Sequence, residues 1–208
     1  MHKLVRTEEP SVLTVAADSY STWDDFPSQE KADVALSLCA MQSERCAYCE
    51  AKLGVGNGHI EHFRRKAPDW FPDLTFSWPN LFYSCMRNGT CGLHKDRVLA
   101  REDVDELINP CDDNPEDFLQ FTHDGRVAVR SGLCERDRKR ADLTIRTFNL
   151  NQETLIAERK NELKKYEWLG QYSTAEIDAC LENLGDVQFI TAIFHFFGRK
   201  YVRSGTAQ

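Results

Sequence analysis

The sequence predicts an α+β fold that is mainly helical and is held together by a structural metal ion. Residues 46–101 are rich in glycine, tryptophan, proline and cysteine, so this segment buries little apolar surface and needs a staple to fold. Apolar residues recur with helical spacing on both sides of it, and residues 118–129 have the pattern of a small β-hairpin. We expect three parts: an N-terminal segment with a helix over 1–45, a stapled core over 46–101, and a helical region with a hairpin, packed on the core, over 102–208.

The first part contains one predicted helix. Residues 1–27 show no periodic apolar pattern. From Ser28 onward, Ala32, Ala35, Leu36 and Cys39 fall on one helical stripe. Serine is a good N-cap residue, so we expect Ser28 to cap this helix, which then leads into the first cysteine pair.

Four cysteines in two pairs form the predicted staple of the second part. The first pair has the two-residue spacing of a zinc knuckle, and the second pair has five residues between its members, including an Asn-Gly turn. Zinc takes four thiolates in a tetrahedron, which two short turns separated by a loop can supply. We therefore predict a structural Zn²⁺ ion, and the alternative is four reduced thiols that lie near loops. The predicted zinc ligands are Cys46, Cys49, Cys85 and Cys91.

Between the cysteine pairs lies the segment Gly58-His59-Ile60-Glu61-His62, whose side chains suit phosphodiester hydrolysis. That reaction needs a general base and a divalent cation such as Mg²⁺ or Mn²⁺. His62 has the near-neutral pKa of a base, and Glu61 offers an oxygen ligand to a hard cation. Because neighbours in a strand point to opposite faces, both serve one site only if the strand ends or twists there. His59 shares a face with Glu61 and is a rival metal ligand or catalytic neighbour.

Two later residues extend this predicted site. Asn80 lies in a Trp-Pro-Asn-Leu turn, where its amide can pin loop backbone groups and orient the histidine. The alternative for Asn80 is a pure turn residue. His94 follows the last cysteine, where the chain should enter a helix, and it could complete the divalent site.

Basic residues near these positions are placed to contact phosphates. The alternative for the run at 64–66 is a solvated surface. Aromatic residues between 70 and 78 could stack on bases, although we expect them to pack over the staple. The predicted phosphate contacts are Arg64, Arg65, Lys66 and Lys95.

The third part begins with a turn cluster at 109–115. Residues 118–122 and 126–129 read as a β-hairpin around Asp124-Gly125. We expect a helix that Asn151 caps and that reaches Leu169. A capping box from Ser173 to Glu176 starts the next helix, and an apolar helix follows over 187–197.

The charge is distributed unevenly along the chain. The net charge is −7, which argues against a freestanding nucleic-acid binder. Residues 56–101 hold seven basic and four acidic residues, so this window is +3 and the remainder is −10. A basic patch on an acidic body can contact phosphates but attracts DNA weakly over distance. We therefore expect a partner that delivers the nucleic acid.

The sequence also carries expectations about the compartment. It has no apolar run of 18 residues and no apolar signal core after the first residues. We expect a cytoplasmic protein, in which eight cysteines act as metal ligands or core thiols rather than as disulfides.

His62, Asn80 and His94, in that order within the two cysteine pairs, resemble the HNH endonuclease family. The resemblance implies a ββα-metal fold, in which a β-hairpin and a helix clasp one catalytic divalent ion. It assigns His62 as the general base, Glu61 as the metal-binding acid and Asn80 as the middle asparagine. The family usually places His or Asn directly after the final zinc cysteine. Gly92 stands there in this chain, and His94 is the nearest substitute.

Longer phrases resemble one branch of that family, the PtuB proteins of Septu anti-phage systems, whose relatives accompany some retrons. The phrases are Gly-His-Ile-Glu-His-Phe-Arg-Arg-Lys, Cys-Gly-Leu-His-Lys-Asp and Asn-Pro-Cys-Asp-Asp-Asn-Pro-Glu-Asp. The resemblance implies a DNA endonuclease that works in a complex with an ABC-type ATPase like PtuA. The alternatives are a zinc-stapled binding module for nucleic acid or protein without catalysis, and a nuclease that needs no ATPase.

Overall fold

A computed structural model describes residues 1–201 of the chain, and the predicted α+β, mainly helical fold is confirmed. The α-helices are α1 (Ser11–Thr14), α2 (Ala16–Ser19), α3 (Ser28–Met41), α4 (Cys91–Val98), α5 (Glu135–Thr147), α6 (Glu153–Lys164), α7 (Thr174–Glu182) and α8 (Ile190–Phe196). The strands are β1 (Gly58–His62), β2 (Leu81–Cys85), β3 (Leu119–Phe121) and β4 (Val127–Val129). The 3-10 turns are η1 (Pro72–Leu74), η2 (Trp78–Asn80), η3 (Arg101–Glu106), η4 (Pro115–Asp117) and η5 (Glu167–Gln171).

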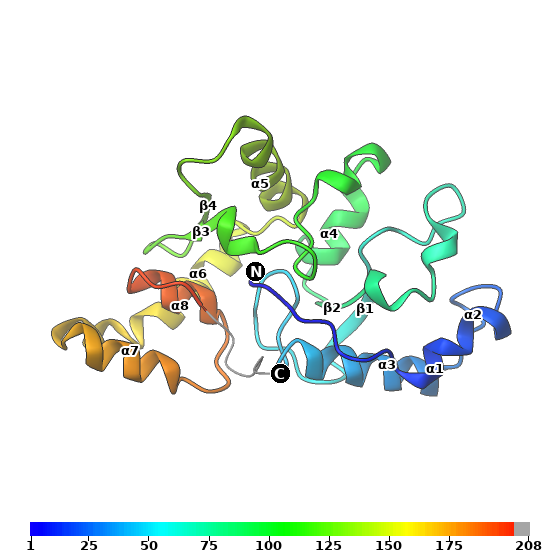
Figure 1. Cartoon of the computed structure of the whole chain (residues 1–208), viewed down its shortest axis with the longest axis horizontal. Helices are drawn as coiled ribbons and strands as arrows, with labels where there is room; N and C mark the ends of the chain where they lie inside the picture. Colours follow the sequence, from blue (N-terminus) through cyan, green and yellow to red (C-terminus); the bar gives the residue numbers. More distant parts are fainter. Residues whose placement is uncertain (202–208) are drawn as a thin grey trace.

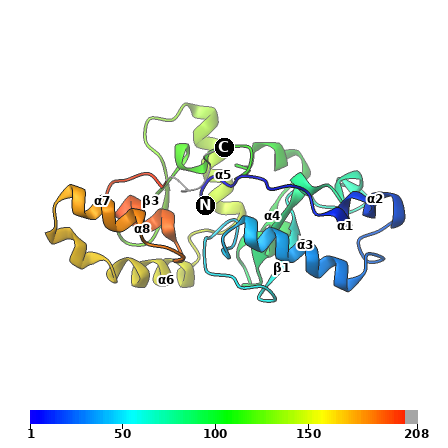
Figure 2. The same cartoon turned by 60° about the horizontal axis from the view of Figure 1, so that its bottom comes forward.

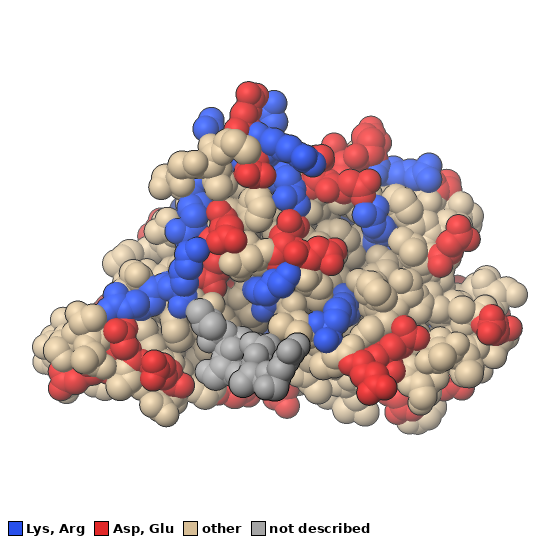
Figure 3. Space-filling model, viewed as in Figure 1, with Lys and Arg blue, Asp and Glu red and all other residues tan. Residues whose placement is uncertain are grey.

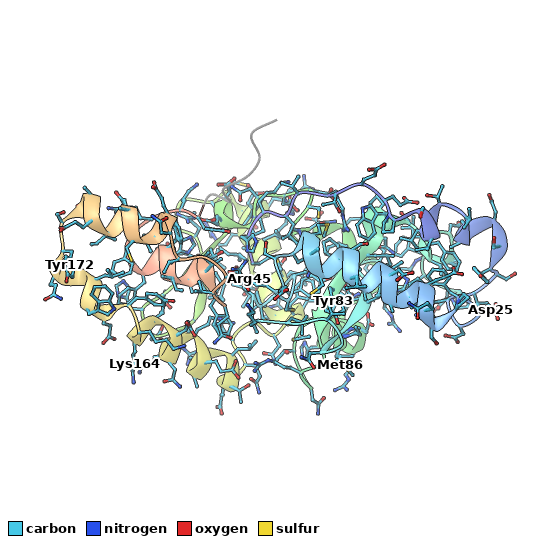
Figure 4. The ribbon with its side chains drawn as sticks, turned by 90° about the horizontal axis from the view of Figure 1, so that it is seen from below. Asp25, Arg45, Tyr83, Met86, Lys164 and Tyr172 are labelled. Atoms are coloured by element: carbon cyan, nitrogen blue, oxygen red, sulfur yellow. The ribbon has the colours of Figure 1, made fainter. Side chains whose placement is uncertain are left out.

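The molecule is elongated, with the β1–β2 hairpin and α4 near its middle (Figure 1). Helices α1 and α2 lie at one end and α6 to α8 at the other, and the same order holds in the turned view (Figure 2). Arg45 lies where the two halves meet (Figure 4), and its Nε donates to the carbonyl of Val187 at 2.5 Å. The N-terminal segment also joins distant parts of the sequence, since the N–H of Leu4 donates to the carbonyl of Pro110.

The β1–β2 hairpin is the scaffold of the candidate site. Its strands are antiparallel, and their register runs from Gly58 opposite Cys85 to His62 opposite Leu81. Strand β2 is buried along its whole length, and both α3 and α4 pack against the hairpin. A long loop that contains η1 and η2 joins the two strands, so the end of β1 opens directly into this loop.

Two predicted helix caps are wrong in detail. Helix α3 begins at Ser28, but Pro27 precedes it in an extended conformation and no side chain caps the helix. Helix α6 is capped by Gln152, whose side chain accepts from the N–H groups of Thr154 and Leu155. Asn151 is occupied elsewhere, because its amide makes two hydrogen bonds to the backbone of Val127 in the second hairpin.

Two other predicted elements of the third part agree with the structure. Strands β3 and β4 form a hairpin around the Asp124-Gly125 turn. The capping box of Ser173 and Glu176 starts α7. The helix predicted to reach Leu169 ends earlier, at Lys164, and is followed by η5.

A single cluster of buried side chains runs from Met1 in the N-terminal segment to Ile193 in α8. The three parts expected from the sequence share this cluster, and their boundaries stay predictions. Among residues 1–201, no helix combines the length and the apolar character that crossing a bilayer needs.

Candidate functional site

The four predicted zinc ligands come together at one end of the hairpin. The Sγ atoms of Cys46, Cys49, Cys85 and Cys91 lie within 4.8 Å of one another, and all four residues are buried. Four thiolates around one zinc ion are about 3.8 Å apart, and the Sγ atoms of Cys49 and Cys85 are 3.9 Å apart. The donor set and its compactness therefore fit a tetrahedral metal ion such as zinc.

The electrostatics of the cluster also favour a cation. Burial alone raises the pKa of Cys46, but hydrogen bonds from the other three thiols hold that pKa well below its usual range. The same contacts hold the pKa of Cys49 and of Cys91 well above the usual range. One thiolate is thus stabilised by its neighbours, and a metal ion would stabilise all four.

His62 lies at the last position of β1 and is almost fully buried. Its Nε2 is 2.9 Å from the carbonyl oxygen of Thr75. A carbonyl oxygen only accepts, so Nε2 carries the proton and Nδ1 keeps its lone pair. Burial lowers the pKa of His62 to about 4, so the imidazole is neutral at pH 7. The Trp23 indole packs nearly perpendicular to the His62 ring, with centroids 4.8 Å apart.

Asn80 holds the loop that supplies the partner of His62. Its Oδ1 accepts from the N–H of Arg64 at 2.8 Å, and its Nδ2 donates to the carbonyls of Arg64 and Leu74 at 3.0 and 3.1 Å. Leu74 immediately precedes Thr75, so the amide fixes both sides of the loop around the histidine. This is the pinning geometry that the turn position suggested.

Glu61 is buried under α4 rather than open to solvent. Its Oε1 forms an ion pair with the ammonium of Lys95 at 2.6 Å, and its Oε2 accepts from the hydroxyl of Tyr48. Tyr48 lies between Cys46 and Cys49, and its ring stacks on Phe148. Burial and the charge of Glu61 raise the pKa of the Tyr48 hydroxyl well above its usual range. Oε2 of Glu61 thus has a hydrogen bond, whereas Oε1 has the ion pair with Lys95 but no hydrogen bond among the described residues.

The two other histidines of the predicted site do not join Glu61 at a common centre. His94 points its Nδ1 at the carbonyl of Thr147, 2.9 Å away, at the end of α5. Gly92, which touches Glu61, is about 200° away from His94 around α4. The Nδ1 of His59 is buried and has no hydrogen-bond partner among the described residues. In the part of the chain that the structure describes, the four cysteines are the one group of three or more His, Cys, Asp or Glu side chains close enough to bind a metal.

The loop after His62 carries guanidinium groups that lie over aromatic rings. Arg64 lies over Phe71, with its Cζ 5.2 Å from the ring centroid, and Arg65 lies over Trp70 at 4.7 Å. Arg101, which the sequence did not single out, also lies over Phe71, with its Cζ 5.3 Å from the ring centroid. These arginine–aromatic contacts are partly exposed, so the cluster presents cations beside the end of β1.

Lys95 does not share this surface. Its side chain is 0% exposed, and its ammonium also contacts Asp96 and the carbonyls of His62 and Phe63. A phosphate would reach Lys95 only by displacing these partners, so we leave Lys95 out of the proposed phosphate contacts. On the face shown in Figure 3, basic and acidic side chains are interspersed, as the modest local charge of the sequence leads one to expect.

Several partners in the site were not foreseen. The carbonyl of Thr75 orients His62. Every residue has a backbone carbonyl, so the sequence does not show which one accepts this hydrogen bond. Tyr48 and Lys95 hold Glu61. The placement of Lys95 had a signal in the sequence, because it lies three residues after Gly92 and therefore on nearly the same face of the helix.

Three known proteins are similar in sequence to this chain. The Septu protein PtuB of Bacillus mycoides (strain KBAB4) is 26% identical, over 90% of this chain and 77% of that protein. A protein of Vibrio cholerae serotype O1 biovar El Tor named "Retron Vc95 putative HNH endonuclease" is 26% identical, over 79% of this chain and 81% of that protein. The Septu protein PtuB of Bacillus thuringiensis is 30% identical, over 57% of this chain and 42% of that protein. No family model matches the chain.

These relatives confirm the resemblance to HNH nucleases of the PtuB type that the sequence motifs predicted. The similarity extends well beyond the segment that carries the cysteines and histidines. The roles of the individual site residues stay predictions.

Proposed function

We propose that the chain is an HNH-type endonuclease of anti-phage defence that hydrolyses phosphodiester bonds of DNA. The relatives support the class, since their names are "Septu protein PtuB" and "Retron Vc95 putative HNH endonuclease". The observation that carries the proposal is the state of His62. It is neutral, its Nε2 is held by a carbonyl, and its Nδ1 keeps a lone pair at the end of the strand.

In the proposed reaction, Nδ1 of His62 accepts a proton from a water molecule, and the resulting hydroxide attacks the phosphorus. The P–O bond to the leaving sugar oxygen breaks, and that oxygen takes up a proton from solvent water. The Nε2–H bond to Thr75 keeps the ring in one orientation and one tautomer. Asn80 supports this orientation through the backbone of Arg64 and Leu74. Its proposed role is positioning, because it touches the loop and not the reacting atoms.

The phosphate contacts that we propose are Arg64, Arg65 and Lys66, together with Arg101. The guanidinium groups of Arg64 and Arg65 lie near the carboxylates of Asp105 and Asp96. Those carboxylates are exposed, so a phosphate group can take their place at little cost.

Two metals enter the proposal differently. The four cysteines fit a structural Zn²⁺ ion, which would hold the knuckle and the start of α4 together. The family resemblance also implies a catalytic Mg²⁺ or Mn²⁺ ion at Glu61 and His94. Lys95 pairs with Oε1 of Glu61 and Tyr48 donates to Oε2. Among the described residues, Glu61 and His94 belong to no group of three or more potential ligand side chains, so these residues do not fit that ion as arranged. We therefore assign no step of the reaction to it.

We propose that the nuclease works in a complex with an ABC-type ATPase like PtuA. The similarity to Septu proteins supports this. The charge of the chain supports it as well, since an acidic protein with a small basic window recruits DNA poorly by itself.

The proposed base is tested by His62→Ala, assembled with the suspected ATPase and assayed on DNA with and without nucleotide. Removal of a general base should lower the cleavage rate about 100-fold or more. The control is His123→Ala, because His123 is exposed on the second hairpin. This variant should cleave DNA at the rate of the parent. Equal cleavage by His62→Ala and the parent would eliminate the proposed mechanism.

The second candidate function is a zinc-stapled binding module without catalysis. The engagement of both Glu61 oxygens and the glycine at position 92 favour it. In that case the assembled complex should bind DNA without cleaving it under any combination of Mg²⁺, Mn²⁺ and nucleotide.

A further inference from the structure

The ammonium of Lys95 lies in a cage of four oxygen atoms. It is 2.6 Å from Oε1 of Glu61, 2.9 Å from Oδ1 of Asp96, 2.7 Å from the carbonyl oxygen of His62 and 3.1 Å from that of Phe63. Lys95 is fully buried, and a buried ammonium persists only where such partners compensate its lost hydration. The cage is therefore a cation site that the chain fills with its own side chain.

The surroundings of Glu61 leave no second cation position on this carboxylate. Its other oxygen accepts from Tyr48, and its side chain is 1% exposed. A Cβ at position 92 would lie 2.3 Å from Cγ of Glu61. The position directly after the last cysteine thus has no room for a ligand side chain, because Glu61 fills that space.

We propose that Lys95 is the resident cation of the Glu61 carboxylate, in place of a divalent metal ion. The inference deepens the proposed function because Glu61 belongs to the same site, but it does not require that the chain cleaves DNA. The distances fit an ammonium, whereas Mg²⁺ demands oxygen ligands at about 2.0–2.1 Å and keeps several waters. The Lys95 ammonium already fills the space between the four oxygens, so a metal ion with its waters finds room there only when that side chain is absent.

The same cage gives Lys95 a positioning role. It donates to the carbonyls of His62 and Phe63, the last residue of β1 and the first residue of the loop. The ammonium therefore fixes the backbone that carries the proposed base, while it neutralises the carboxylate beside it.

The test measures Mn²⁺ binding to the full-length, zinc-loaded chain by calorimetry, without DNA. Glu61→Gln should leave the Mn²⁺ affinity of the chain within about twofold of the parent, since removing a true ligand costs about tenfold or more. Lys95→Ala should instead gain a Mn²⁺ site about tenfold tighter than any in the parent, and Glu61→Gln in that background should remove it. Controls are Glu153→Gln and Lys164→Ala, both exposed on α6.

Two results would overturn the proposal. One is a parent protein whose Mn²⁺ affinity falls about tenfold or more with Glu61→Gln. The other is a Lys95→Ala protein that keeps its zinc and its circular dichroism spectrum but gains no Mn²⁺ site.

A measurement on the parent alone decides the matter if the variants do not fold. With ¹⁵N-labelled lysine, the buried Lys95 ammonium should give a protected NMR signal that Mn²⁺ leaves sharp. Broadening of that signal by Mn²⁺ at low occupancy would place the metal at Glu61 and refute the proposal. None of these readouts depends on turnover, so they are independent of the His62→Ala cleavage assay.

Discussion

Asn80 offers the sharpest test of how this site is held together. Its amide makes three hydrogen bonds to backbone groups of the loop after β1, at 2.8 to 3.1 Å, and the residue is 5% exposed. Each such bond contributes about 1 kcal/mol net, so Asn80→Ala should lower the free energy of unfolding by about 3 kcal/mol. Urea unfolding of the zinc-loaded protein measures this difference.

Two further variants separate the contributions. Asn80→Asp keeps the acceptor for the N–H of Arg64 but loses both donors, so it should be destabilised by about 2 kcal/mol or more. Asn88→Ala is the matched control, because Asn88 is exposed and accepts only from the exposed Arg97 among the contacts that the structure describes. It should stay within about 0.5 kcal/mol of the parent.

The kinetic consequence follows from the same contacts. If Asn80 positions the loop around His62, Asn80→Ala should also lower the cleavage rate of the assembled complex at saturating DNA. A stability of Asn80→Ala within about 0.5 kcal/mol of the parent would refute the hydrogen-bond reasoning. A destabilised variant with an unchanged cleavage rate would refute the positioning role alone.

Three other predictions address the metal, the proton and the charge of the site. Cys49→Ser should lose the bound zinc, measured by atomic absorption, and should unfold at a lower temperature, whereas Cys134→Ser, at an exposed single cysteine, should keep one zinc per chain. Because the pKa of His62 is lowered to about 4 in the folded chain, the unfolded state takes up a proton first as the pH falls. The contribution of His62 to the free energy of unfolding is complete above about pH 6.5 and should decline by about 3 kcal/mol by pH 4. His62→Gln should flatten that part of the plot of unfolding free energy against pH. Arg101→Ala should weaken DNA binding by the complex and reduce the slope of log binding constant against log salt concentration by about one. Arg136 is exposed on α5, and Arg136→Ala should change neither quantity. Equal effects of the two substitutions would contradict the assignment of the phosphate-binding surface.

The spacing of residues along the chain was enough to predict several features. Two cysteine pairs separated by a loop indicated the metal cluster because knuckle spacing reflects the reach of a short turn. The capping box at Ser173 was readable because both partners lie within one helical turn. The Asp-Gly dipeptide at 124–125 marked the second hairpin for the same local reason.

Contacts between distant segments could not be read in this way. Asn151 has the chemistry of a helix cap, but the second hairpin claims its amide and Gln152 caps the helix instead. A local preference of about 1 kcal/mol is easily overridden when a buried backbone pair needs a partner.

For the candidate site, the sequence by itself indicated the cysteine cluster at the Cys85 end of the hairpin and the turn asparagine near His62 at the other end, because cysteine spacing and turn residues are local signals. Only the tertiary structure decided what those side chains do to one another. It put the neutral His62 against the carbonyl of Thr75, and it filled the oxygen cage beside Glu61 with the ammonium of Lys95. The physical reason is that a buried charge or ring nitrogen takes the partner that folding brings within about 3 Å, and that partner can be a backbone atom or a residue far along the chain.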